Sequence, residues 1–398
     1  MMRQNRVWGW MLVLAAYGCG ESGESAGTQP NAQPPAVNPV GMMTPGTAGA
    51  AADPGAMRTG NPPVAPSGPG TTPIQPTPNM PGTPGEQPAG PTPVKPDPDP
   101  AVPTGSYDYE MEQVALDADL VIASGKTVRV GPGVVFTAKA GVKVQVDGML
   151  IVEGSAAATV RFVGAGMPRS WHGIVVGSGG YAGLKHVEIA GATYGIHALK
   201  GSDFEVTDSA IGTSFKAAVV ESNGSFDRVR FHASGDPTFS PVNEVSIDDV
   251  NGTLTILDAS PTVTNSSFDG SAALVDMIRV GGNGSPVFDH LHIVDAHCAF
   301  HLNGGVNNSP KISNTVFERL SYGIMAYATK PVVENSVFRD NAYDVGFCFD
   351  ATEANAPQLK NNFYSAGMAG VDPSCFQIGA DEPTPAAMPN SAAGPVGL

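Results

Sequence analysis

The feature that most constrains the fold is a repeat of 21 to 26 residues in the C-terminal half of the chain. Each copy is marked by a proline. An apolar residue follows two positions on, Asn or His four positions on, and a second apolar residue six or seven positions on. The prolines are Pro261, Pro286, Pro310, Pro331 and Pro357. A period of this length predicts a solenoid in which neighbouring copies share one core.

Two of these features form columns along the chain. The polar column comprises Asn265, His290, Asn314, Asn335 and Asn361. The apolar column comprises Ile189, Ile211, Phe231, Phe268, Ile293, Phe317, Phe338 and Phe363. A second apolar column, about seven residues further on, comprises Ile196, Val219, Phe300, Ile324 and Val345. We therefore expect equivalent side chains to stack from copy to copy, with the apolar columns facing the core.

The repeats are typical of β-strands rather than helices. Their segments are short, rich in Val, Ile, Phe and Thr, and alternate apolar with polar residues, as in residues 334–338. Asn suits the left-handed backbone conformation that a tight corner requires. The sequence therefore predicts an all-β fold, a parallel β-helix of about 11 to 12 coils, with coils about 4.8 Å apart.

The N-terminal part of the repeat region carries a family resemblance. Residues 125–136 and 146–154, followed by the Trp171-x-Gly173-Ile174 motif, resemble the opening coils of exported right-handed β-helix proteins of the pectate-lyase-like superfamily. The resemblance covers about residues 120–378 and implies a right-handed parallel β-helix. It implies no single function, because the superfamily includes lyases, hydrolases, adhesins and proteins of unknown role.

The first 19 residues have the pattern of a signal peptide. Arg3 and Arg6 precede an apolar stretch, residues 7–16, which ends close to Cys19. A small residue directly before this cysteine resembles the lipobox of bacterial lipoproteins, although the family prefers Leu where this chain has Ala16. The resemblance implies acylation of Cys19, anchoring to a membrane through the N-terminal lipid, and export toward the outer membrane or cell surface. The alternative is ordinary secretory cleavage.

Composition divides the rest of the chain. Residues 20–103 hold 22 of the 36 prolines and few large apolar residues, so they are expected to stay disordered. We therefore expect a signal peptide at 1–18, a lipidated linker at 19–103, the β-helix at 104–378 and a loose tail at 379–398. The net charge of −16 comes without a block of Lys or Arg, which argues against a nucleic-acid partner.

The motifs of polysaccharide-cleaving enzymes are mostly missing. No Arg-x-Pro-x-x-Arg run is present, and the one adjacent pair of aspartates is Asp248-Asp249, beside an insertion in the repeat. We therefore expect no catalytic site and no cofactor. Asp248 and Asp249 keep a polysaccharide lyase or glycoside hydrolase as an alternative, and a solvated turn is the other interpretation of the pair.

Two tyrosines and four histidines are candidates for binding. Tyr322 and Tyr343 are 21 residues apart and each precedes a core residue by two, so they are expected to stack as a platform for sugar rings or to pack laterally within the coil. The histidines are His290, His292, His297 and His301. His290 belongs to the polar column, and we expect no metal site.

The cysteines beyond Cys19 are Cys298, Cys348 and Cys375. Cys348 and Cys375 are 27 residues apart, about one coil, which matches the distance that a disulfide spans. Cys298 is two coils away from Cys348 and is expected to be a buried thiol outside the disulfide.

The sequence favours a non-catalytic surface lipoprotein that serves adhesion or binds polysaccharide or another surface protein. Two alternatives remain open, namely an enzyme of the pectate-lyase-like superfamily and a purely structural envelope protein.

Overall fold

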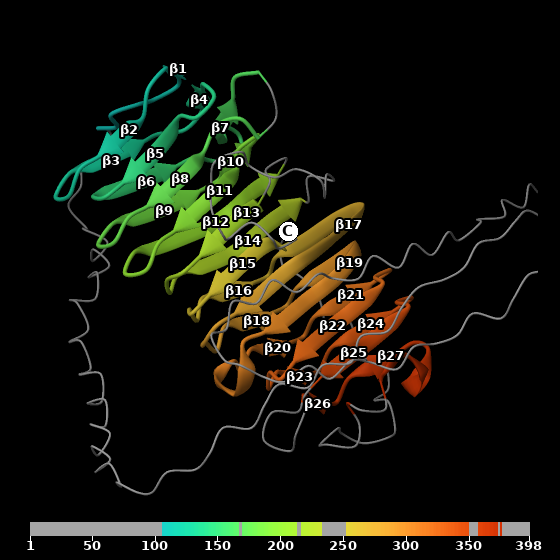
Figure 1. Ribbon diagram of the computed structural model, residues 1–398. Helices are drawn as coiled ribbons and strands as arrows, with labels where there is room; N and C mark the ends of the chain where they lie inside the picture. The colour runs from blue at the N-terminus through green and yellow to red at the C-terminus, as the bar shows by residue number, and fades with distance from the viewer. Residues whose placement is uncertain are drawn as a thin grey trace, which may run out of the picture. The chain divides into compact units, whose positions relative to one another are not determined.

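The chain folds into a right-handed parallel β-helix (Figure 1). The computed structural model describes residues 106–166, 169–212, 216–232, 252–349, 357–372 and 375. Every pairing between named strands in these residues is parallel. Cys19, the expected linker and tail, and the Asp248-Asp249 pair lie outside the described residues.

Each coil contributes strands to three faces of the solenoid. The first face contains β1 (Gln113–Leu116), β4 (Val135–Ala138), β7 (Val160–Gly164), β10 (Val187–Ala190), β21 (Val316–Glu318), β24 (Val337–Arg339) and β27 (Phe363–Tyr364). The second contains β2 (Leu120–Ile122), β5 (Lys143–Val146), β8 (Gly173–Val176), β11 (Tyr194–Ala198), β13 (Lys216–Val220), β15 (Gly252–Leu257), β22 (Tyr322–Tyr327) and β25 (Tyr343–Phe349). The third contains β3 (Thr127–Val130), β6 (Met149–Glu153), β9 (Tyr181–Lys185), β16 (Thr262–Thr264), β18 (Val287–Asp289), β20 (Lys311–Ser313), β23 (Val332–Glu334) and β26 (Gln358–Lys360).

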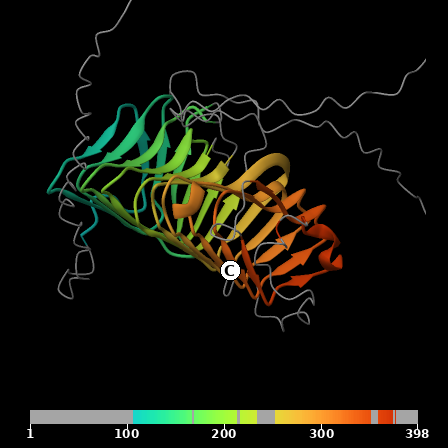
Figure 2. The ribbon, with the colours of Figure 1, turned by 60° about the horizontal axis from the view of Figure 1, so that its bottom comes forward.

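Four longer strands pass through a corner and belong to two faces. β12 (Asp203–Gly212) and β14 (Ser225–His232) run from the third face into the first, whereas β17 (Ser267–Gly281) and β19 (His292–Asn303) run from the first into the second. Short 3-10 helices, η1 (Gly305–Asn307) and η2 (Gly367–Gly370), lie in connections late in the chain. Figure 2 shows the coils following one another in chain order.

The stack has about nine turns rather than the 11 to 12 expected. The expectation assumed coils of about 22 residues throughout. Several coils are longer: Val135 pairs with Arg161, and Arg230 pairs with Ser267 across the 37-residue coil that holds the insertion. Longer coils place more residues in corners, so the same length of chain completes fewer turns.

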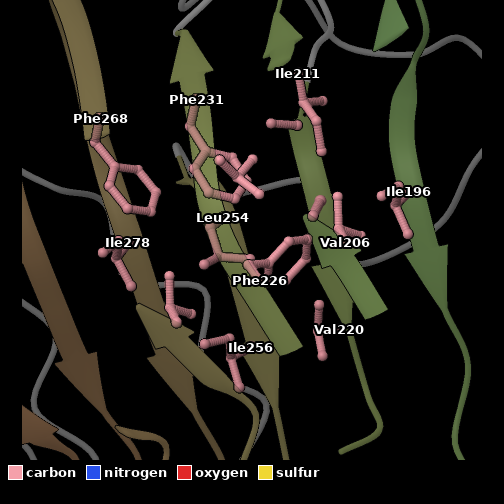
Figure 3. Close-up of a cluster of buried hydrophobic side chains, with 14 of the residues drawn as sticks. Ile196, Val206, Ile211, Val220, Phe226, Phe231, Leu254, Ile256, Phe268 and Ile278 are labelled. Atoms are coloured by element: carbon pink, nitrogen blue, oxygen red, sulfur yellow. The ribbon is translucent and has the colours of Figure 1, made fainter. Parts of the chain in front are cut away.

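The main apolar column lies in the core, with one correction at its end. Phe231 stacks on Phe268 with ring centroids 4.4 Å apart, and Figure 3 shows both rings in one buried cluster with aliphatic side chains of the second face. The last member is Tyr364 rather than Phe363, because Phe338 pairs with Tyr364 in the register. Phe363 therefore does not belong to the column.

The second apolar column also needs one correction. Ile196 pairs with Ala218, whereas Val219 pairs with His197 on the outer side of the second face. All five residues of β13 are buried, and a strand buried on both sides loses the alternation that separates inner from outer positions. Val219 therefore looked like a core residue in the sequence although it points outward.

The corner between the third and first faces carries the polar column. All five predicted residues have a positive φ, between 48° and 54°, which confirms their left-handed conformation. Direct stacking of asparagines occurs between Asn361 and Asn335, whose side chains are 2.6 Å apart. Elsewhere the asparagine bonds to an aspartate of the preceding coil, as Asn314 does to Asp289 at 2.8 Å.

A row of buried hydroxyls follows this corner and was not foreseen from the sequence. The hydroxyl oxygens of Ser209, Ser266 and Ser336 each accept a hydrogen bond from a backbone N–H of the preceding coil, at 3.0, 3.0 and 3.2 Å. These bonds satisfy buried polar groups and hold neighbouring coils in register. The corner keeps nearly the same length in these coils, whereas the other two corners vary in length, the largest step running from His232 to Gly252.

The structure contains a disulfide between Cys348 and Cys375, whose Cα atoms are 5.5 Å apart. Cys298 is buried, and its thiol donates to the carbonyl oxygen of Phe300 at 3.0 Å. We expect the exported, unreduced protein to show one alkylatable thiol among these three cysteines after denaturation, read by intact mass. Three modified cysteines would contradict the pairing, and reduction before alkylation is the control.

Candidate functional site

The candidate site lies on the second face, where four consecutive strands bring distant residues into one row. The register pairs Asp276 of β17 with Cys298 of β19, Cys298 with Tyr322 of β22, and Tyr322 with Tyr343 of β25. These residues are 21 to 24 positions apart in sequence, and they become neighbours because parallel strands stack at about 4.8 Å.

Tyr322 and Tyr343 stack on each other, an arrangement that fits both of the sequence interpretations. Their ring centroids are 5.2 Å apart and their planes differ by 10°. Tyr343 is 51% exposed, which makes it one of the few large apolar side chains on the surface of the described residues. The pair therefore presents an aromatic face and a phenolic hydroxyl to solvent, a combination that suits contact with an amphipathic ring.

A buried carboxylate lies beside the tyrosine pair. Asp276 is 4% exposed, and its two oxygens lie 3.1 Å from Nδ1 of His297 and 2.8 Å from Nδ1 of His301. Burial opposes ionisation of Asp276, but the hydrogen bonds and charge of the two histidines outweigh it and lower the pKa of this carboxyl group. Asp276 is therefore held as a carboxylate that orients two imidazoles.

The histidines connect this carboxylate to the aromatic residues. The ring of His297 meets the ring of Tyr322 edge to face, with centroids 5.3 Å apart. The ring of His301 stacks on Tyr327 at 5.3 Å. His297, Asp276, Tyr322 and Tyr343 thus form one contiguous group across four strands, which we call the tyrosine–histidine surface.

Sequence reasoning found only the tyrosines of this group. Asp276 and its two histidines do not share a register position, and the pairing of β17 with β19 is irregular before Asp276. Their contact therefore leaves no fixed spacing in the sequence. The clustering of histidines was the one signal available.

The four histidines separate into two kinds. His290 lies at the corner and contacts Asp289 at 2.7 Å, and His292 faces Glu318 at 3.2 Å. Only His297 and His301 converge on one group. Within the described ranges, no set of three or more His, Cys, Asp or Glu side chains is arranged to hold a metal ion.

Two expected sites cannot be placed. Asp248 and Asp249, the alternative catalytic pair, and Cys19, the lipidation site, lie outside the described residues. Among the residues that the structure does describe, no helix is long and apolar enough to span a bilayer.

Comparisons with known proteins add no assignment. No protein-family model, curated protein or solved structure matches this chain. The structure therefore shows the parallel β-helix itself, and a β-helix is compatible with surface or binding proteins and with polysaccharide-cleaving enzymes.

Proposed function

We propose that this protein is a non-catalytic lipoprotein of the bacterial cell surface that binds polysaccharide through Tyr322 and Tyr343. The observation that carries the proposal is the stacked pair itself, with Tyr343 half exposed on a rigid face. Rigid, partly exposed aromatic rings supply contact area at little entropic cost. A sugar ring has an apolar face and polar edges, which matches the surface that these rings present.

The stacking also argues for a preformed site. Tyr322 and Tyr343 are positioned by backbone pairing between β22 and β25, so little ordering is needed when a ligand binds. Preorganised side chains on regular strands favour affinity because the ordering cost has been met during folding.

A binding screen tests the proposal. Purified full-length protein in detergent would be titrated with neutral and acidic polysaccharides, and each would be checked for chain cleavage. We expect saturable binding that Tyr343→Ala weakens by about tenfold or more, equivalent to roughly 1.4 kcal/mol. Tyr343→Phe, which keeps the ring, should retain most of the binding.

Two results would contradict this function. Cleavage of a polysaccharide would favour the enzyme alternative, for which Asp248→Asn and Asp249→Asn are the variants to test. Equal binding by wild type and Tyr343→Ala would remove the tyrosines from the site. Tyr181→Ala, on the third face, is the matched control, and it should leave binding unchanged.

Membrane anchoring is a separate part of the proposal. It depends on the lipobox-like residues before Cys19. We expect the wild-type protein to fractionate with membranes and Cys19→Ser to release it, because one acyl modification site would be lost. Mass analysis of the mature N-terminus supplies the direct readout. An unmodified Cys19 in soluble wild-type protein would contradict the anchor.

A further inference from the structure

We propose that His297 selects an uncharged, hydroxyl-rich sugar at the tyrosine–histidine surface, by accepting a hydrogen bond at Nε2. This inference rests on the proposed function and adds the class of sugar that is bound.

The hydrogen-bond pattern fixes the tautomer of His297. A carboxylate accepts hydrogen bonds and donates none, so Nδ1 of His297 must carry the proton that points at Asp276, 3.1 Å away. In a neutral imidazole the other nitrogen then carries a lone pair. Nε2 of His297 is therefore an acceptor. The same reasoning makes Nε2 of His301 an acceptor.

Exposure distinguishes the two histidines. The side chain of His297 is 24% exposed and that of His301 is 11% exposed. In the part of the chain that the structure describes, Nε2 of His297 has no hydrogen-bond partner. His297 also lies against Tyr322, next to the exposed ring of Tyr343. Nε2 of His297, rather than Nε2 of His301, is therefore placed to accept a hydrogen bond from a sugar ring stacked on the two tyrosines.

The carboxylate behind His297 disfavours an anionic ligand at Nε2. Asp276 of β17 accepts the hydrogen bond from Nδ1 of His297. His301 bonds to the same carboxylate, and Arg279 pairs with His301 rather than with His297 in the register. With neutral histidines, a sugar carboxylate would face a lone pair backed by a carboxylate.

The test measures binding of dextran and of alginate to the full-length protein in detergent at pH 8. We expect the wild-type protein to bind dextran more tightly than alginate. His297→Phe keeps a ring against Tyr322 but removes the acceptor. It should bind dextran about tenfold more weakly than the wild-type protein, the change that roughly 1.4 kcal/mol produces. His232→Phe, whose histidine lies on the first face, is the matched control.

Each outcome has a defined meaning. Dextran binding that depends on Tyr343 but not on His297 would overturn this inference and leave the proposed function standing. Stronger binding of alginate than of dextran at pH 8 would also overturn the inference. Saturable binding of neither polymer would overturn both. If His297→Phe fails to fold, judged by circular dichroism, His297→Gln and the imidazole nitrogen shifts of the wild-type protein provide the readout.

Discussion

Gly173→Ala is expected to lower the free energy of unfolding by more than about 4 kcal/mol, a loss that single substitutions rarely cause. Gly173 opens β8 with φ of 121°, a conformation that residues with a side chain rarely adopt. A Cβ at this position would overlap the carbonyl oxygen of Tyr194 in the next coil. That oxygen belongs to the backbone of β11, so the clash can be relieved only by moving a strand.

The matched control is Gly141→Ala. Gly141 also has a positive φ, 76°, but no atom lies within 4 Å of the position that a Cβ would take. Its substitution should cost only the strain of the backbone conformation, about 1–2 kcal/mol. Urea titration followed by circular dichroism compares the two variants. Similar midpoints for both would show that the approach of Tyr194 to Gly173 is not as close as described.

Phe317→Ala is expected to cost about 3–5 kcal/mol. The side chain of Phe317 is fully buried and stacks on Phe338 with centroids 4.3 Å apart. Truncation removes this contact and leaves a cavity between rigid coils, which have little freedom to collapse into it. The same denaturation measurement applies.

Phe363→Ala separates a core position from a peripheral one. Phe363 is only partly buried and pairs with Val337 on the outer side of the first face. Its loss should therefore cost clearly less than the loss of Phe317. A larger effect at Phe363 would mean that the register of the last coil is wrong and that the column ends at Phe363 after all.

The regular features of the fold were predictable because they repeat. Asn335 and Asn361 recur at a fixed distance from a proline, and a left-handed corner is the physical reason that Asn is used there. The errors came where a more strongly apolar side chain was preferred to the residue at the repeat spacing. Tyr364 lies seven residues after Pro357, the spacing of the earlier copies, and it pairs with Phe338, whereas Phe363 lies only six residues after Pro357.

Of the candidate site, the two tyrosines were predictable from the sequence, whereas the contact between Asp276 and His297 was not. Tyr322 and Tyr343 occupy the same register position in successive coils, so their spacing equals the coil length. Asp276 meets His297 across an irregular stretch of pairing, where no constant spacing exists. When two side chains occupy non-equivalent positions in neighbouring coils, their contact depends on local geometry. A repeat pattern in the sequence does not encode that geometry.

The constancy of the third-to-first corner has a consequence for how such a chain can diversify. Because the buried hydroxyls at this corner tie each coil to the next, the first-to-second corner can change length without shifting the stack, as the interval between His232 and Gly252 shows. The same corner lies just before Tyr322, between β21 and β22. Loop grafts there would give a library of recognition surfaces on an unchanged scaffold, with affinity selected separately from folding.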